Sequence, residues 1–303
     1  MKIYLAGKMS GLPEWGFPLF DKAQKVLENK GHEVISPAQL DREEGFDEKT
    51  ETVFTEEQRL AAMRRDYRAI CEVDAVCFLS NAHQSTGALL ERKFARKVGA
   101  QLLHYDGGAR EGFFREIPIG IAGYAGSGKD TVGQMLSDIL DYPVEHFADT
   151  MRHMLYAINP DITGADEASL QRNVDTIGWD AAKRKFPQVR EMLQRLGTEG
   201  GRDIFGENFW IDNLFDQFPQ HGGEMYHGRI IPDVRFANEA KAIKDAGGFV
   251  VRVDRPGVGP ANAHASERLE FEPDFGINND GTLDFLLRTV LKAILHWQQE
   301  GWL

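Results

Sequence analysis

A chain of 303 residues is long enough for two domains of ordinary size. Its residues are 42% hydrophobic and 27% charged, as in globular proteins, and its net charge of −12 argues against a surface that binds DNA or RNA. The two cysteines, Cys71 and Cys77, lie in apolar stretches and are predicted to be reduced core residues. The N-terminal segment has too few apolar residues before Lys8 to form the apolar region of a signal peptide. No apolar run is long enough for a membrane span, so we expect a cytoplasmic protein.

Two short apolar strands, each followed by a glycine turn, divide the sequence into two units. The glycine-rich segment 106–112 between them is predicted to be a linker, and we place the domains at residues 1–108 and 109–303. In the first unit strands alternate with helices, which predicts an α/β fold with a flavodoxin-like or Rossmann-like parallel sheet. The predicted strands are Lys2–Ala6, Glu33–Ser36, Asp74–Leu79 and Gln101–Tyr105, and the predicted helices are Phe17–Asn29, Glu56–Cys71 and Ala88–Val98.

Two stretches of the first unit carry further expectations. In the last helix, Leu90, Phe94 and Val98 recur every four residues and predict a buried stripe. The acidic segment Asp41–Thr55 has almost no hydrophobic pattern, which predicts a loop near the edge of the sheet, either a lid or a plain solvated loop.

The second unit also alternates strands and helices, and a three-layer α/β/α domain is expected. A mostly helical stretch is predicted from residue 166 to residue 218. The other predicted elements are the strands Ile117–Ala122, Val144–Phe147, Arg229–Val234 and Phe249–Val253, and the helices Thr131–Leu140, Thr150–Ile158, Ala237–Ala246 and Leu283–Trp297.

The segment after strand Ile117–Ala122 matches the phosphate-loop pattern G-x-x-x-x-G-K, except that Asp130 replaces the usual Ser or Thr. Glycines let backbone N–H groups wrap a phosphate, the following helix adds its positive end, and Lys129 reaches the β and γ phosphates. A carboxylate at Asp130 and the hydroxyl of Thr131 are candidate ligands of Mg²⁺. The predicted nucleotide-binding residues are Gly123, Gly126, Ser127, Gly128, Lys129, Asp130 and Thr131.

Polar residues for the rest of a phosphotransfer site follow later in the chain. Asp233, at the end of a strand, has the position of the carboxylate that completes a P-loop magnesium site; the alternative is a solvated strand-end aspartate. Guanidinium groups bind phosphate through two hydrogen bonds, although a surface ion pair is an alternative for each. The arginines considered for an acceptor phosphate are Arg152, Arg202, Arg235, Arg252 and Arg255.

Several motifs in the second unit together resemble the bacteriophage deoxynucleoside monophosphate kinases. They are the Gly-Ser-Gly-Lys-Asp-Thr loop, residues 193–202, Phe209-Trp210, the segment 233–240 and residues 264–267. The resemblance implies ATP and Mg²⁺, a dNMP acceptor and a dNDP product. The predicted catalytic residues of this unit are Lys129, Asp233 and Arg235. Acceptor contacts are expected from Arg202, Arg235, Asp149 and Arg152, and Trp210 either stacks on the base or is a buried core residue.

The first unit contains a group of candidate site residues: Asp66, Asp74, Ser85, Gly87 and Glu91. Asp74 opens an apolar strand, Ser85 and Gly87 lie in the turn after it, and Glu91 lies one turn into the next helix. A hydroxyl and backbone N–H groups at the start of a helix form an anion site, here Ser85 and Gly87. A glutamate beside this site could attack the anomeric carbon of a ribosyl group, with Glu91 as nucleophile and Asp66 as acid or base. The alternative is that Glu91 is an ordinary residue on the helix surface.

The N-terminal motifs resemble the nucleoside 2-deoxyribosyltransferase-like superfamily, which includes deoxynucleoside monophosphate N-glycosidases. They are residues 3–7 and 11–20, Arg65-Asp66, residues 73–76 and residues 85–91. The resemblance implies that Glu91 acts on the sugar, that Asp66 assists, and that Ser85 suits a 5′-phosphate. Gly7 and Lys8 follow the first strand, where Lys8 departs from the usual Gly-Pro. Lys8 either adds a phosphate contact or marks a drift away from catalysis.

The sequence therefore predicts a phage-derived, bifunctional enzyme of nucleotide metabolism that acts in the host cytoplasm. Its expected partners are the small molecules dNMP and ATP, with no nucleic acid and no membrane, and we expect a homo-oligomer formed through the N-terminal unit. Two alternatives stay open. The first unit could be a non-catalytic nucleotide sensor or dimerisation module, or the whole chain could sequester nucleotides.

Overall fold

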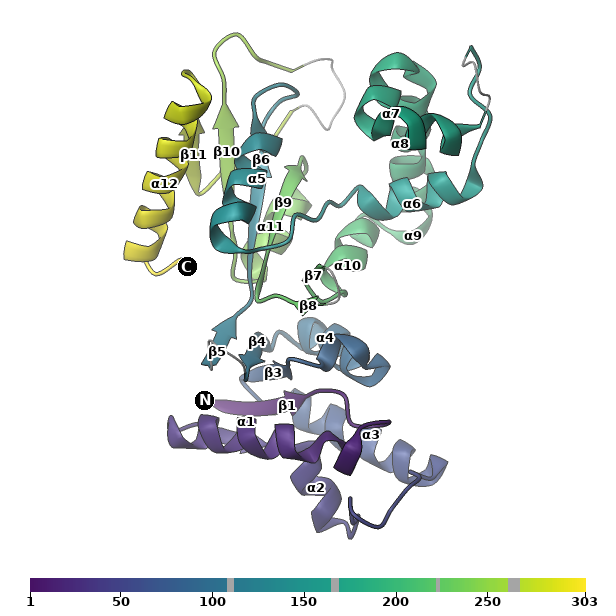
Figure 1. The fold of residues 1–303 in the computed structure, drawn as a ribbon, viewed down its shortest axis with the longest axis vertical. Coiled ribbons are helices and arrows are strands. Elements are labelled where there is room, and N and C mark those ends of the chain that lie inside the picture. The colour runs from purple at the N-terminus through teal and green to yellow at the C-terminus, as the bar shows by residue number, and fades with distance from the viewer. Residues whose placement is uncertain (108–111, 165–168, 222–223, 261–267) are drawn as a thin grey trace.

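The chain forms two α/β units that lie one above the other along the long axis of the molecule (Figure 1). The computed structural model describes residues 1–107, 112–164, 169–221, 224–260 and 268–303. The domain boundary expected between residues 108 and 109 lies outside the described residues. In the described part of the chain, the two sheets separate at Glu116, between the last strand of the first unit and the first strand of the second.

The first unit has a five-stranded sheet in the order β2-β1-β3-β4-β5, and its first four strands are parallel. The order of these four strands is flavodoxin-like, so the predicted parallel sheet is confirmed. Helices α1 and α2 cover one face and helices α3 and α4 the other. The elements are β1 (Lys2–Ala6), η1 (Pro13–Gly16), α1 (Phe17–Asn29), β2 (Glu33–Ile35), α2 (Pro37–Glu43), α3 (Glu56–Cys71), β3 (Ala75–Leu79), η2 (Ala82–Gln84), α4 (Thr86–Val98), β4 (Gln101–Asp106) and the antiparallel β5 (Gly112–Arg115).

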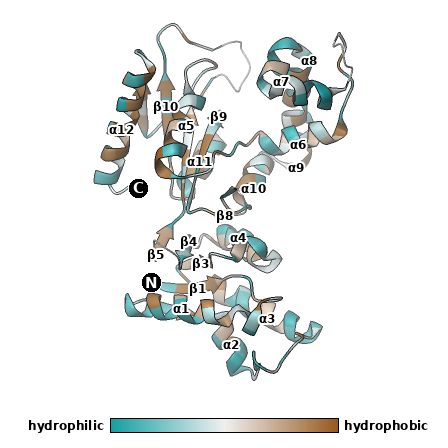
Figure 2. Cartoon of the chain, in the orientation of Figure 1, coloured by the Kyte–Doolittle hydropathy of each residue, from teal (hydrophilic) through white to brown (hydrophobic). Residues whose placement is uncertain are grey.

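The second unit has a parallel sheet in the order β11-β10-β6-β9 and is the expected three-layer α/β/α domain. Helices α5 and α12 pack on one face, and α10 and α11 on the other. The sheet is largely hydrophobic, between helices that carry hydrophilic residues (Figure 2). The main elements are β6 (Ile117–Ala122), α5 (Lys129–Leu140), α6 (Asp149–Ile158), α10 (Phe209–Phe215), β9 (Gly228–Val234), α11 (Ala237–Asp245), β10 (Phe249–Asp254), β11 (Phe275–Asn278) and α12 (Leu283–Gln299).

A helical subdomain stands beside this sheet, as expected for the stretch from residue 166 to residue 218 (Figure 1). Its core is formed by residues of α6, α7 and α8, among them Leu155, Val174 and Val189. The elements are α7 (Leu170–Lys185), α8 (Pro187–Gly197), the π-helical turn η3 (Thr198–Arg202) and α9 (Asp203–Phe205), and a short hairpin, β7 (Gln220–His221) with β8 (Glu224–Met225), follows α10.

The prediction that Leu90, Phe94 and Val98 form the buried face of α4 is wrong. Leu90 and Val98 are 41% and 43% exposed, whereas Ala88, Arg92 and Ala95 form the buried face. An arginine lies on this face because the second unit supplies a buried counter-charge, which a pattern of apolar residues does not reveal.

The segment Asp41–Thr55 is only in part the solvated loop that its composition predicts. Its first residues belong to α2, and the buried Asp41 accepts a hydrogen bond from Arg65 at 2.8 Å. Phe46 is buried against Trp15 and Phe54, so aromatic packing anchors the segment.

Three smaller expectations also differ from the structure. The strand predicted at Val144–Phe147 is reduced to one bridge between Val144 and Ile230. Cys77 is buried as expected, but Cys71 at the end of α3 is exposed. Part of the predicted linker, from Gly112, forms β5 and extends the first sheet.

The two units share a packed interface. Phe218, which follows α10, lies in the same hydrophobic cluster as the residues on one face of the first sheet. Its ring meets the Phe78 ring edge-on at a centroid distance of 5.1 Å. Arg96 of α4 pairs with Asp216 at 2.6 Å. The first unit therefore completes one of its hydrophobic faces only with residues of the second.

Candidate active sites

The phosphate loop lies between β6 and α5, at the carboxyl edge of the second sheet. Gly126 and Gly128 have φ of +85° and +96°, a left-handed conformation that glycine adopts without strain, and Gly128 directly precedes α5. Lys129 and Asp130 start the helix, and their side chains form an ion pair at 2.6 Å. The Lys129 side chain is 13% exposed and that of Asp130 is 74% exposed. The strand, loop and helix predicted from the sequence are thus brought together.

Close packing fixes the shape of this loop. A Cβ at Gly123 would overlap Ser127 Oγ and the carbonyl oxygen of Val253, and a Cβ at Gly128 would overlap the amide of Asn279. Asn279 Nδ2 donates to the carbonyl oxygen of Ser127 at 2.8 Å. Ser127 Oγ is buried and has no partner among the described residues. A cradle that only glycine fits, with a buried hydroxyl left over, suits a nucleotide phosphate.

Asp233, at the carboxyl end of β9, faces the start of the helical subdomain. Its two carboxylate oxygens accept hydrogen bonds from the N–H groups of Phe147 and Ala148, both at 3.1 Å. Each oxygen keeps a lone pair, so the carboxylate can still serve a metal ion. Asp233 therefore holds the segment that leads into α6, a role that the sequence did not indicate.

The start of α6 carries a charged cluster that includes two of the predicted acceptor residues. Asp149 accepts from the ring of His146 at 3.2 Å and from Arg152 at 3.0 Å. Burial lowers the pKa of His146, but the hydrogen bond to Asp149 and the charges of Asp233 and Asp149 outweigh burial and raise it. The sequence analysis did not identify His146, because the carboxylates around it, Asp149 and Asp233, lie on two different elements.

Arg202 and Arg235, the two predicted acceptor residues outside α6, meet at Glu239. Arg202 Nη2 donates to Glu239 Oε1 at 2.7 Å, and the backbone N–H of Arg235 donates to Glu239 Oε2 at 2.8 Å. Burial raises the pKa of Glu239 to about 7. Arg252 and Arg255 lie elsewhere, beside the phosphate loop: Arg252 is 5.9 Å from the Tyr124 ring centre, and Arg255 is 3.4 Å from the carbonyl oxygen of Gly126.

Of the two roles expected for Trp210, stacking on a base or packing in the core, the structure shows packing in the core. It is 1% exposed, its indole N–H donates to the carbonyl oxygen of Gly197 at 2.8 Å, and a Cβ at Gly201 would overlap its ring. Trp210 is therefore a core residue that supports the turn before Arg202, and its ring is not open to a base. Residues 264–267 of the kinase-like motifs lie outside the described residues.

The candidate site of the first unit centres on a tyrosine and two carboxyl groups. Tyr4, in the middle of β1, donates from its hydroxyl to Glu91 Oε1 of α4 at 2.8 Å. Burial raises the pKa of Glu91 to about 8, and the negative charge of Asp66 contributes further. Burial also raises the pKa of Asp66 to about 6, although Arg65 opposes the rise. Glu91 and Asp66 are thus brought together, and Tyr4 is a site residue that the sequence did not single out.

Other predicted residues of the first unit lie around the carboxyl end of β1. Ser85 caps α4 by accepting from the N–H of Ala88 at 3.2 Å, and the space beside Gly87 is open apart from that hydroxyl. The backbone of Lys8 exchanges two hydrogen bonds with the Asn81 amide, at 3.0 and 3.1 Å, and Gly7 is crowded by the same amide.

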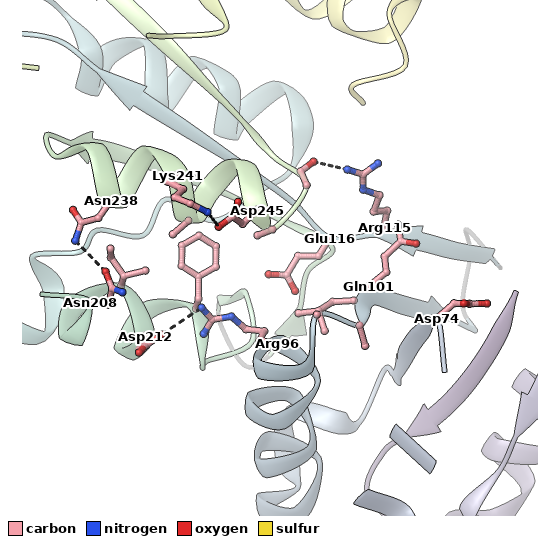
Figure 3. Close-up of a pocket in the computed structure, with 18 residues that line it drawn as sticks. Asp74, Arg96, Gln101, Arg115, Glu116, Asn208, Asp212, Asn238, Lys241 and Asp245 are labelled. Atoms are coloured by element: carbon pink, nitrogen blue, oxygen red, sulfur yellow. Dashed lines mark hydrogen bonds and ion pairs between the residues drawn. The ribbon is translucent and has the colours of Figure 1, made fainter. Parts of the chain in front are cut away.

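Asp74 does not belong to this group. It directly precedes β3, at the opposite edge of the sheet, where its carboxylate accepts a hydrogen bond from the backbone N–H of Lys2 at 2.7 Å. It lines a cavity of about 670 Å³ between the two units (Figure 3). Charged residues of that cavity are already paired, Arg96 with Asp212 and Lys241 with Asp245.

The fold and the loop together define a P-loop phosphotransferase. Residues 165–290 match the family described as Deoxynucleotide monophosphate kinase, and residues 1–104 match a domain of unknown function (DUF4406). The chain is 30% identical over 169 residues to a protein of Acanthamoeba polyphaga mimivirus named as a deoxynucleotide monophosphate kinase. The match covers 50% of this chain and 80% of that protein. The chain therefore belongs, through its second unit, to the deoxynucleotide monophosphate kinase family.

Other similarities cover smaller parts or are weaker. The deoxynucleotide monophosphate kinase of Enterobacteria phage T4 is 29% identical over 108 residues, 35% of this chain and 45% of that enzyme. A solved 2-deoxyribosyltransferase of Bacillus psychrosaccharolyticus is 25% identical, with a TM-score of 0.27, over 35% of this chain and 72% of that one. The APS kinase CysC of Mycobacterium tuberculosis, solved with AMPPNP and APS, is 16% identical, with a TM-score of 0.29, over 59% and 98%. These TM-scores support no conclusion about function.

Two findings bear on metal and membrane binding. Among the described residues, no group of three or more His, Cys, Asp or Glu side chains is arranged to hold a metal ion. A magnesium ion at a P-loop needs fewer protein ligands, because nucleotide phosphates and water complete its shell, so this absence does not argue against the predicted ligands Asp130, Thr131 and Asp233. No helix in the described ranges is both long and apolar enough to span a bilayer.

Proposed function

We propose that the second unit transfers the γ-phosphoryl group of ATP to a deoxynucleoside monophosphate, giving ADP and a dNDP. The observation that carries this proposal is the glycine cradle before α5, with Lys129 at its end, in a chain of the deoxynucleotide monophosphate kinase family. In the reaction an oxygen of the acceptor phosphate bonds to the γ-phosphorus as the bond to ADP breaks.

Nucleotide binding falls to the phosphate loop. Backbone N–H groups of residues 123–131 and the start of α5 would hold the phosphates of ATP, and Lys129 would exchange its ion pair with Asp130 for them. Asp130, Thr131 and Asp233 would hold Mg²⁺, which would supply the positive charge that the transferred group needs. The protein contributes position and charge, which suffice for phosphoryl transfer.

In this proposal, arginine side chains bind the acceptor. Arg202 and Arg235 are joined through Glu239, and Arg152 lies with Asp149 at the start of α6, which Asp233 holds in place. Guanidinium groups from both regions would bind the 5′-phosphate of the dNMP.

ADP release, measured with one dNMP at a time, tests this function. Mass spectrometry of the product should show the dNDP. Turnover of no common or modified dNMP, despite tight nucleotide binding, would instead support the alternative that the chain sequesters nucleotides.

For the first unit we propose cleavage of the N-glycosidic bond of a dNMP. The supporting observation is the half-buried pair Glu91 and Asp66, with the Tyr4 hydroxyl hydrogen-bonded to Glu91. A Glu91 oxygen would bond to C1′ as the C1′–N bond breaks, and Asp66 would protonate the departing base. Water then releases deoxyribose 5-phosphate from Glu91. Ser85 and the start of α4 would hold the 5′-phosphate.

A non-catalytic sensor or dimerisation module is the competing function for this unit, and homo-oligomerisation through it stays a prediction. The test requires the full chain, because contacts of Phe218 and Arg96 pack this unit against the second. A Lys129→Ala background removes the kinase reaction and leaves only base release to be measured. Binding of dNMP without any base release would favour the sensor.

A further inference from the structure

Glu239 is a buried carboxylate on α11 that contacts both arginines expected at the acceptor site. Its Oε1 accepts from Arg202 Nη2 at 2.7 Å, and its Oε2 accepts from the N–H groups of Arg235 and Phe236 at 2.8 and 3.1 Å. The residue is 3% exposed. The Glu239 side chain thus orients the guanidinium of Arg202 and fixes the backbone of Arg235.

Arg202 is held at both ends. Its backbone belongs to η3, where the absence of a Cβ at Gly201 lets the buried Trp210 ring lie against the turn. Its guanidinium lies 4.0 Å from the centre of the Phe236 ring and pairs with Glu239. A guanidinium between a ring face and a carboxylate loses most of its rotational freedom before any ligand binds.

The hydrogen bonds leave part of the guanidinium for a ligand. Glu239 engages Nη2, and Arg202 Nε is buried with no partner in the described part of the chain. The side chain is 17% exposed. A cation this well fixed, with donors still available, suits a phosphate more than a structural ion pair.

From this arrangement we propose that Glu239 is a positioning residue for the acceptor phosphate, acting through Arg202. The proposal rests on the kinase function proposed above. Glu239 itself contacts no substrate. The competing role is purely structural, because the same carboxylate accepts the N–H groups at the start of α11.

Glu239→Gln tests the proposal because glutamine has one acceptor where glutamate has two. Either the link to Arg202 or the links to the two N–H groups must be lost. We expect the KM for dNMP to rise about 10-fold, with the KM for ATP unchanged. Asp245→Asn is the matched control, since it removes the same charge from an exposed position of α11. Thermal unfolding of each variant reports any structural effect separately.

A double-mutant cycle with Arg202→Ala decides the outcome. Arg202→Ala should raise the KM for dNMP about 10- to 150-fold, and Glu239→Gln should add little in the double variant. Independent, multiplying effects, or an equal rise in both KM values, would overturn the positioning role and leave the kinase function intact. An Arg202→Ala variant with unchanged dNMP kinetics would instead show that Arg202 is outside the acceptor site, which removes the basis of the proposal.

Discussion

Arg92 and Glu116 form a two-pronged ion pair, with N···O distances of 2.6 and 2.7 Å, that joins the two units of the chain. Arg92 is on α4 of the first unit, and Glu116 precedes the first strand of the second. Arg229 of β9 contacts the same carboxylate at 3.3 Å. All three side chains are buried, and the two arginines hold the pKa of Glu116 well below its usual value, in spite of burial. Glu91, the candidate nucleophile, is the neighbour of Arg92 in the chain.

The first prediction concerns this charge cluster. Glu116→Gln leaves the buried guanidinium of Arg92 without its counter-charge, whereas Arg229 keeps its ion pair with Glu145 at 2.9 Å. The change should lower the free energy of unfolding by about 3–5 kcal/mol. Asp284→Asn, which breaks an exposed pair with Arg288, should cost no more than about 1 kcal/mol. Urea unfolding of both variants provides the measurement. Equal costs would show that the cluster does not stabilise the junction.

Stability should also depend on pH through Glu116. Its pKa is lowered in the folded chain, so its contribution is present above the unfolded value of about 4.5 and is lost as the pH falls below it. Urea unfolding between pH 3 and pH 7 should therefore show a smaller acid loss for Glu116→Gln than for the unchanged protein. An identical acid loss in both would contradict this assignment.

Lys129→Ala should abolish ADP release with every dNMP while leaving the melting temperature nearly unchanged, because among the described residues its ammonium pairs only with the exposed Asp130. Lys241→Ala, which removes an exposed lysine of α11, is the control. Near-normal turnover by Lys129→Ala would refute the kinase assignment.

Asp233→Asn should lower kcat roughly 100-fold at saturating magnesium, more than it weakens acceptor binding. The amide keeps one acceptor, so one of the N–H groups of Phe147 and Ala148 also loses its partner. Steady-state kinetics with varied dNMP and Mg²⁺ separate the effects. A change confined to the KM for dNMP would make Asp233 a binding residue and would exclude the magnesium role.

Base release by the first unit should depend on the ionisation of its two carboxyl groups. Attack requires ionised Glu91, whose pKa is about 8, and protonation of the base requires the acid form of Asp66, whose pKa is about 6. We expect a bell-shaped rate profile with limbs near these values, reported by the coupled pair. Glu91→Gln should stop base release without changing kinase activity. A flat profile from pH 5 to pH 9 would rule out this chemistry.

Much of the fold follows from local sequence. Most of the parallel strands are short apolar runs before a turn, although the parallel strand β11 was not predicted. The helices after β1 and β6 begin at their predicted positions or within two residues of them. The phosphate loop is also local, because the glycines, Lys129 and the helix start are contiguous. The hydrophobic pattern of the sequence did not predict burial that depends on the other unit, as for Arg92 on α4. It also did not predict that aromatic contacts of Phe46 anchor an acidic segment.

The sequence by itself determined two α/β units, a phosphate loop and the residue types of both candidate sites, since these are properties of contiguous residues. Only the tertiary structure decided which side chains meet: Tyr4 with Glu91 across 87 residues, Arg202 with Glu239 across 37, and Arg92 with Glu116 across 24. It also buried Trp210. These pairings arise when strands and helices pack, because burial makes an unpaired polar group costly and so favours arrangements in which most buried polar groups find a partner.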